Sequence, residues 1–198
     1  FGDVGTYQLV VPKVTFGQAD ILAEFFKDQN DMDGILGLAF QSISVNGVKP
    51  VFQEAIDQKL VDQPLFTVWL EHERYAQNEF GGIYTWGAFD NMNCGPVLGY
   101  QPLSSATYYQ FQMSHVSIGS YSSNTKYEVI SDTGTSYLAA PQDVVERIAN
   151  AAGAQYVEEW GLYKIDCNAN MPDLVLTVGP FQLSLTAKNM IGAVSNGY

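Results

Sequence analysis

The chain has 198 residues, enough to bury the core of one or two domains. Nine Lys and Arg residues against 21 Asp and Glu residues give a formal net charge of −12, which leaves no basic stripe for phosphate groups. This charge excludes nucleic acid and anionic membrane surfaces as partners, and no apolar run reaches the about eighteen residues that a membrane-spanning helix needs. The acidic composition is compatible with an acidic compartment and equally with neutral solution.

Short β-strands, separated by Gly, Pro, Asn and Ser, dominate the predicted elements. The first is a segment rich in β-branched residues, 8–16, whose Pro suits a strand end. Further strands are predicted, in chain order, at residues 67–70, 82–86, 108–113, 116–118 and 174–178. Apolar positions at helical spacing behind a Pro predict helices at 50–60 and 141–152. Close-set strands are typical of packed antiparallel sheets, so the predicted fold is mainly β.

Cys94 and Cys167 are the only cysteines. They form no Cys-x-x-Cys pattern, and no His is spaced as a zinc partner, so we predict no metal site. The triplet Glu71-His72-Glu73 has no third ligand beside it and is predicted to be an exposed charged loop. The two cysteines could pair with each other, stay reduced or pair with cysteines outside this sequence, and the sequence leaves all three arrangements open.

The hexapeptide Ser131-Asp132-Thr133-Gly134-Thr135-Ser136 carries the most specific chemical pattern, and it occurs once. It follows the apolar pair Val129-Ile130, so Asp132 is predicted to stand in a Gly-containing turn directly after a buried strand. Aspartic proteases present a catalytic carboxylate in this way and use two such carboxylates that share one proton. An isolated Asp-Thr-Gly is more often an ordinary turn, so the interpretation depends on companion segments.

Several ordered segments supply that context and resemble the pepsin family of aspartic proteases. Residues 33–40 (Asp-Gly-Ile-Leu-Gly-Leu-Ala-Phe) resemble a first-lobe segment of the family, and residues 60–66 resemble the segment that follows the first-lobe helix. Gly81-Gly82, Tyr108-Tyr109-Gln110 and the Asp132 hexapeptide then appear in the family's order. From Tyr100 onward the sequence is similar to digestive or lysosomal members from nematodes.

This resemblance implies a bilobal pepsin-like acid protease fold, mainly β and here partial. Residues 1–95 would form the later part of the N-terminal lobe and 96–198 most of the C-terminal lobe. The family's first Asp-Thr-Gly-Ser, its flap segment Tyr-Gly-Thr-Gly and its closing apolar-Gly-Asp strand do not occur in this sequence. Cys167 matches a second-lobe cysteine whose partner is expected beyond Tyr198.

The resemblance also implies a role for each residue of the hexapeptide. Asp132 would be one of two catalytic aspartates that activate a water molecule for attack on a peptide carbonyl. Thr133 would hold the two catalytic loops together through its hydroxyl, and Gly134 would allow the tight turn. Thr135 would donate a hydrogen bond to the catalytic carboxylate and favour its charged form.

Four further positions match residues that line the family's substrate cleft. Tyr108 and Ile130 match positions on the leaving side of the scissile bond, and Met32 and Ile35 match positions on the acyl side. An apolar cleft would select large hydrophobic side chains. The expected partners are therefore protein or peptide substrates and pepstatin-like inhibitors, with no cofactor.

The implied function is an aspartic endopeptidase that cleaves between bulky hydrophobic residues at acid pH. We expect a monomer that is secreted (digestive lumen) or lysosomal, and we expect the 198-residue chain alone to be inactive because it holds one catalytic aspartate. The alternative is a catalytically inactive pepsin-like binding protein or an inert proteolytic fragment. Two copies that each contribute Asp132, as in retroviral proteases, are disfavoured because one chain carries segments of both lobes.

Overall fold

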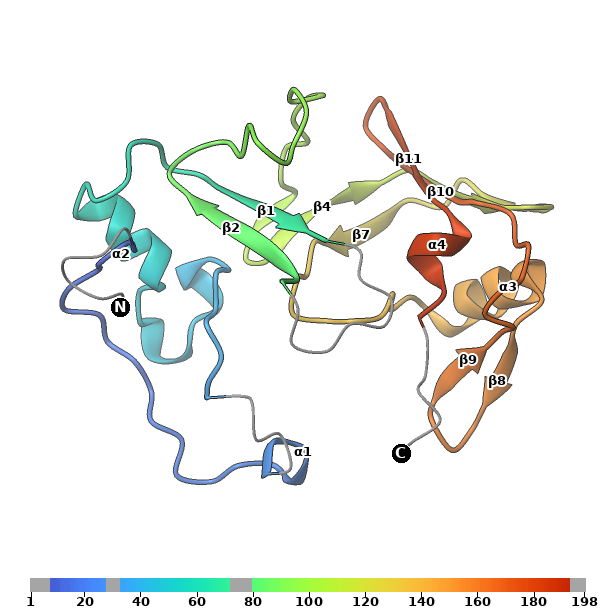
Figure 1. Cartoon of the computed structure of the whole chain (residues 1–198), viewed down its shortest axis with the longest axis horizontal. Helices are drawn as coiled ribbons and strands as arrows, with labels where there is room; N and C mark the ends of the chain where they lie inside the picture. The colour runs from blue at the N-terminus through green and yellow to red at the C-terminus, as the bar shows by residue number, and fades with distance from the viewer. Residues whose placement is uncertain (1–7, 28–32, 72–79, 193–198) are drawn as a thin grey trace. The chain divides into compact units, whose positions relative to one another are not determined.

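The structure is a computed structural model that describes residues 8–27, 33–71 and 80–192 (Figure 1). The chain forms two compact units. The first comprises Phe1–Trp69, Gly82–Pro96 and Ala106–Tyr108, and the second comprises Leu70–Gly81, Val97–Ser105 and Tyr109–Tyr198. The lobes expected at 1–95 and 96–198 remain a prediction.

Strands outnumber helices in the described part, which confirms the prediction of a mainly β fold. The strands are β1 (Phe66–Leu70), β2 (Gly82–Trp86), β3 (Ser105–Ala106), β4 (Tyr109–Met113), β5 (His115–Ile118), β6 (Tyr121–Ser123), β7 (Tyr127–Ile130), β8 (Gln155–Val157), β9 (Leu162–Lys164), β10 (Leu174–Val178) and β11 (Phe181–Leu185). The helices are α1 (Glu24–Lys27), α2 (Val51–Asp57), α3 (Gln142–Ala152) and α4 (Ala187–Met190), with 3₁₀ turns η1 (Gln41–Ile43) and η2 (Val45–Gly47). No helix in the described ranges has the length and apolar character needed to cross a bilayer.

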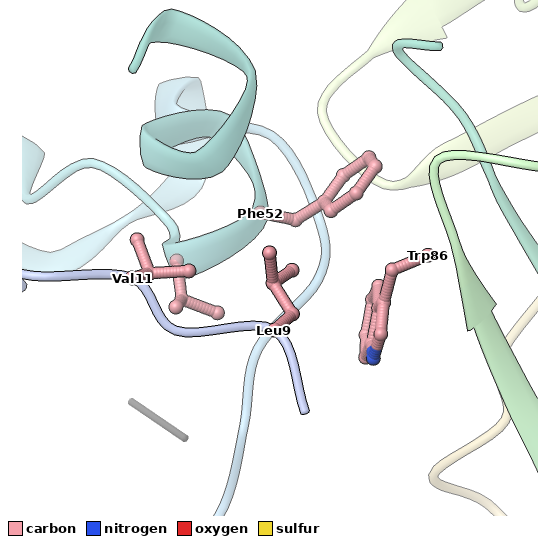
Figure 2. A pocket seen from close by; sticks show the side chains of 5 residues that line it. Leu9, Val11, Phe52 and Trp86 are labelled. Carbon is pink, nitrogen blue, oxygen red and sulfur yellow. The ribbon is translucent and has the colours of Figure 1, made fainter. Parts of the chain in front are cut away.

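The first unit is built around α2 and the two-stranded sheet β1-β2. Helix α2 buries Val51, Phe52 and Ala55, and Val11 from the N-terminal segment lies against this apolar face with only 1% of its surface exposed. Figure 2 shows Val11 and Leu9 beside the helix, facing a crevice lined also by Phe52 and Trp86. The chain's N-terminal segment is thus held by side-chain burial.

An aromatic cluster joins α2 to the sheet of this unit. The ring centres of Phe52 and Phe66 lie 5.2 Å apart in an edge-to-face arrangement, and Trp86 lies 5.5 Å from Phe52. Tyr84 stacks on Trp86 with ring centres 5.6 Å apart. Such pairs add to the stabilisation that comes from buried area alone.

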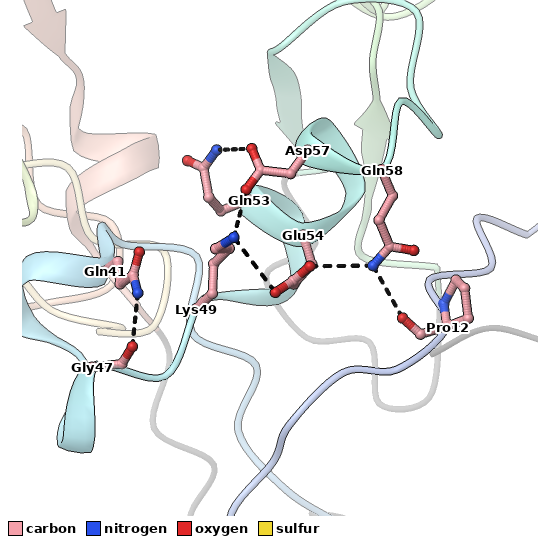
Figure 3. A network of polar contacts seen from close by, with 8 residues as sticks. All are labelled: Pro12, Gln41, Gly47, Lys49, Gln53, Glu54, Asp57 and Gln58. Atoms are coloured by element: carbon pink, nitrogen blue, oxygen red, sulfur yellow. Dashed lines mark hydrogen bonds and ion pairs between the residues drawn. The ribbon is translucent and has the colours of Figure 1, made fainter.

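A polar network on the surface of α2 fastens two neighbouring segments to the helix (Figure 3). Lys49 Nζ donates to Asp57 Oδ2 at 2.7 Å and lies 3.8 Å from Glu54 Oε1. Gln58 Nε2 donates to Glu54 Oε2 and to the carbonyl oxygen of Pro12. These contacts are exposed or half-buried, so each contributes little, but together they fix the turn at Pro12 beside the end of α2.

The second unit contains a four-stranded antiparallel sheet in the order β11-β10-β5-β6. The register pairs Leu174 with Ile118 and Leu176 with Val116. Val116, Ile118 and Leu174 are almost fully buried and form the centre of the core. Helix α3 presents Ile148, Ala151 and Ala152 to this core, which places it against the sheet.

One sequence-based prediction about the first unit is wrong, and a second is confirmed over a shorter range. Residues 8–16 form no strand: Lys13 has a positive φ of 59°, which interrupts an extended conformation, and the segment is anchored by the buried Val11 instead. The helix expected at 50–60 ends at Asp57, because Lys59 adopts a left-handed φ of 56° and the Leu60 N–H donates back to the Ala55 carbonyl. That geometry is a helix C-terminal stop made without glycine.

Candidate active site

The strand β7 carries the chain into the Asp132 turn and is paired along its length with β4. Val129 lies opposite Phe111 and Tyr127 opposite Met113, and these side chains belong to or pack against the core of the second unit. The Ser131 N–H donates to the Tyr109 carbonyl at 3.1 Å and extends the pairing beyond the end of β7. The turn therefore begins from a strand whose position is set by buried side chains.

Both oxygens of the Asp132 carboxylate accept hydrogen bonds within the turn. The backbone N–H of Gly134 donates to Oδ1 at 2.9 Å, and the hydroxyl of Thr135 donates to Oδ2 at 2.7 Å. The side chain is therefore held in one orientation although the whole stretch 131–140 is exposed. A carboxylate that is both fixed and accessible is suited to acid–base work on a bound molecule.

Glycine at position 134 leaves room for the close approach of its backbone N–H to the Asp132 carboxylate. A Cβ atom added at this position would lie 3.3 Å from Asp132 Oδ1, which is tighter than an ordinary van der Waals contact. A larger residue would push the carboxylate away from the N–H that orients it. The reason for glycine here is space at the carboxylate.

The same two hydrogen bonds set the ionisation of Asp132. The Thr135 hydroxyl, followed by the Gly134 N–H, holds the pKa of Asp132 below the ordinary value of a carboxyl group, against a smaller opposing effect of desolvation. Donors that point at the charged form favour that form. Asp132 is therefore ionised further into the acid range than an unassisted aspartate.

Comparison with known proteins decides the family. The sequence profile described as "Eukaryotic aspartyl protease" matches residues 3–197. The chain belongs to the eukaryotic aspartyl protease family. This membership confirms the predicted resemblance to pepsin-like aspartic proteases.

Similar proteins with known names support this assignment to the family. "Aspartic protease 6" of Caenorhabditis elegans is 50% identical over 197 residues, which cover 100% of this chain and 50% of that protein. "Aspartic protease 2" of Necator americanus is 43% identical, covering 96% and 44% respectively, and "Cathepsin D" of Canis lupus familiaris is 34% identical, covering 98% and 47%. The predicted similarity to nematode members is confirmed, and the chain spans about half the length of the relatives that it matches.

The resemblance gave a role to four residues of the hexapeptide, and the structure joins three of them by hydrogen bonds. Asp132, Gly134 and Thr135 are joined by hydrogen bonds, and Thr133 lies in the same exposed turn. The prediction that Thr133 links two catalytic loops stays untested.

The expected substrate-binding residues are distributed over both units. Ile35 and Tyr108 belong to the first unit and Ile130 to the second, where it ends β7 opposite Gln110. All three are accessible, with exposed fractions of 79%, 49% and 44%. Met32 lies outside the described residues.

The described residues also bear on the metal and cysteine predictions. They contain no group of three or more His, Cys, Asp or Glu side chains placed to hold a metal ion, and His72 and Glu73 lie outside them. Cys94 and Cys167 are both free thiols in the structure. Within these residues the two cysteines do not pair with each other, while the reduced state and pairing with cysteines outside this sequence both stay open.

Sequence reasoning missed a polar cluster on the same sheet as the Asp132 turn. The Glu128 carboxylate accepts hydrogen bonds from the hydroxyl of Ser104, from Gln110 Nε2 at 3.1 Å and from Gln112 Nε2 at 3.4 Å. These donors, led by Ser104, lower the pKa of Glu128 below the ordinary carboxyl value. The alternation of side chains along β7 could have placed Glu128 and Ile130 together on the face opposite the core. The cluster ties Ser104 and β4 to β7 just before the turn.

Proposed function

We propose that the chain is the part of an aspartic endopeptidase that contributes Asp132 as one of the two catalytic aspartates. The hydrogen-bonded carboxylate of Asp132 carries this proposal, because both of its oxygens are oriented while the group stays accessible. Membership of the aspartyl protease family supplies the reaction class, hydrolysis of peptide bonds. The second carboxylate comes from outside these 198 residues, since the sequence holds one Asp-Thr-Gly.

The proposed reaction divides two tasks between the carboxylates. The ionised member removes a proton from water while the water oxygen bonds to the peptide carbonyl carbon. The protonated member donates a hydrogen bond to the carbonyl oxygen, which takes up the electron pair of the C=O double bond. When the tetrahedral intermediate collapses, the C=O double bond re-forms, the C–N bond breaks, and the leaving nitrogen receives the proton that the first carboxylate took from water.

The low pKa of Asp132 fits this chemistry. Two carboxylates that share a proton titrate as one unit, and one of them must be ionised in acid for water to be activated. Donation by Thr135 and Gly134 favours the ionised form of Asp132 at low pH. These hydrogen bonds support activity in acid, and the cleavage experiment below separates this proposal from the alternative of a pepsin-like binding protein or an inert proteolytic fragment.

For specificity, we propose that apolar side chains select bulky hydrophobic residues on both sides of the scissile bond. Ile130 and Tyr108 would contact the leaving side and Ile35, with Met32, the acyl side. The accessibility of Ile35, Tyr108 and Ile130 supports this assignment, because each exposes apolar surface that a substrate can cover.

The expected setting is an acidic one. The net charge of −12 becomes less negative as carboxylates take up protons, so repulsion between the carboxylates declines at low pH. One relative is named "Vacuolar aspartic protease", from Candida albicans, at 31% identity. We propose a monomer that is secreted (digestive lumen) or lysosomal, acts on proteins or peptides and is blocked by pepstatin-like inhibitors.

The test is peptide hydrolysis by the natural polypeptide that carries residues 1–198. A library of internally quenched peptides is offered in acid and at neutral pH, and the cleaved bonds are mapped by mass spectrometry. We expect cleavage between bulky apolar residues in acid, abolished by a pepstatin-like inhibitor. Binding of peptides and inhibitor with no cleavage at any pH would identify an inactive binding protein instead.

A further inference from the structure

Helix α3 and the hairpin β8–β9 line a hollow of about 740 Å³ that is open to solvent, within the second unit (Figure 1 shows the two elements side by side). Known ligand sites span roughly 300–1,000 Å³, so this volume admits a side chain together with its backbone. The hollow is lined by Ala140, Gln142, Val145, Glu146, Asn150, Ala154, Gln155, Tyr156 and Tyr163. None of these residues takes part in the site proposed for hydrolysis.

One wall of the hollow is aromatic. Tyr156 on β8 and Tyr163 on β9 are register partners, and their ring centres lie 5.2 Å apart with the planes inclined by 57°. Tyr156 is 58% exposed, so much of its ring is available to a ligand. An accessible aromatic face attracts cations through its quadrupole.

The wall formed by α3 is largely polar and carries one negative charge. Gln142, Glu146 and Asn150 follow at four-residue intervals and so share one face of α3, opposite the residues that pack on the core. Gln142 Nε2 donates to Glu146 Oε1 at 2.8 Å, which orients the carboxylate. In the described ranges no cation pairs with the second oxygen, Oε2, so it is open to a ligand.

Two basic side chains that neighbour lining residues in the sequence, Arg147 and Lys164, contact aromatic rings. The Arg147 guanidinium lies 6.0 Å from the centre of the Tyr121 ring, and Lys164 Nζ lies 5.9 Å from the centre of the Trp160 ring. Neither residue lines the hollow. The hollow therefore combines aromatic faces and a carboxylate, with no cation of its own, in a chain whose net charge is −12.

We propose that this hollow is a docking site for a basic peptide segment. An Arg or Lys side chain of the segment lies against Tyr156 and Tyr163 and forms an ion pair with Glu146. The amides of Asn150 and Gln155 are placed to bond with the segment's backbone. Charge complementarity favours this occupant, because the exposed Glu146 carboxylate attracts a cation and repels an anion. The inference does not depend on the proposed catalysis, because Asp132 takes no part.

The probe is a short labelled peptide, acetyl-Gly-Arg-Gly-Arg-Gly-amide, titrated by fluorescence anisotropy at low ionic strength. Its matched control replaces each Arg by citrulline, which keeps the shape and removes the charge. The natural polypeptide is used as the Asp132→Asn variant, so that hydrolysis does not consume the probe. We expect saturable binding of the Arg peptide that weakens with added salt, and much weaker binding of the citrulline peptide.

Four substitutions of exposed side chains locate the site. Glu146→Gln and Tyr156→Leu should each weaken binding about fivefold, the size of a partly exposed ion pair or cation–π contact, while Tyr156→Phe keeps the ring and should bind like the parent. Glu158→Gln removes the same charge from the hairpin turn, outside the hollow, and should leave affinity unchanged. Equal binding of the citrulline peptide would overturn the proposal. So would equal weakening by Glu158→Gln and Glu146→Gln, which would mean general attraction to an acidic surface.

Discussion

Thr135 is the side chain on which the ionisation of Asp132 depends most. Its hydroxyl is the largest cause of the lowered pKa of Asp132, so Thr135→Val should raise that pKa toward the ordinary carboxyl value. At a given acid pH a smaller fraction of Asp132 is then ionised. The acid limb of the kcat/KM profile against pH should therefore move to higher pH, as measured with an internally quenched peptide.

Thr135→Ser is the matched control for this prediction. Serine keeps the hydroxyl that donates to Asp132 Oδ2, so its acid limb should coincide with that of the parent. Because the pKa of Asp132 is lowered, the hydrogen bond from Thr135 stabilises the turn fully at pH values above the ordinary carboxyl pKa. This stabilisation is lost as the pH falls through the lowered pKa and Asp132 takes up a proton. An unchanged acid limb in Thr135→Val would contradict the assigned role of the hydroxyl.

At this residue scale, the distance along the chain decides what the sequence could predict. Asp132, Gly134 and Thr135 are two and three positions apart, and a turn alone brings their polar groups together. The Glu128 cluster was missed because Ser104 is 24 positions away and meets Glu128 only after the strands have paired. The register of β4 and β7 had to be known first.

Among the elements, the N-terminal segment is anchored to α2 by the buried side chain of Val11. Val11 is 1% exposed, so Val11→Ala removes apolar contacts and should lower the free energy of unfolding by about 2 kcal/mol. Val45→Ala makes the same change at a side chain that is 81% exposed and should have almost no effect. Urea unfolding followed by near-ultraviolet circular dichroism measures both. Equal stability of the two variants would show that Val11 does not anchor the segment.

Elements with a strong internal pattern were predictable. The strands expected at 82–86 and 174–178 match β2 and β10, and the helix expected at 141–152 is α3 within one residue, ended by Gly153 at φ 81°. Residues 8–16 have a similar β-rich composition but no ladder partner in the described part, so composition alone misled. The hairpin β8–β9 was overlooked because its strands have three residues each, too few to show alternation.

On the scale of the whole molecule, the single Asp-Thr-Gly limits what residues 1–198 can catalyse alone. A polypeptide of residues 1–198 alone should not hydrolyse peptides in acid, because the chemistry needs two carboxylates and the sequence supplies Asp132. The measurement is hydrolysis against protein concentration, with sedimentation to establish that the chain is monomeric. A rate that rose with the square of the concentration would mean that two copies each contribute Asp132, against the monomer proposed here.

The most direct measurement for the central claim is the hydrolysis rate of the purified Asp132→Asn variant of the natural polypeptide in acid. Asn keeps an oxygen that can accept from Gly134 N–H, so the turn should persist while the ionisable group is lost. Asp166→Asn is the matched control, since Asp166 Oδ1 accepts from the Asn168 N–H in a similar turn with no proposed catalytic role. We predict that Asp132→Asn loses at least about a thousandfold in kcat/KM and that Asp166→Asn keeps the parent's rate. Parent-like hydrolysis by Asp132→Asn, with its fold verified by circular dichroism, would contradict the account.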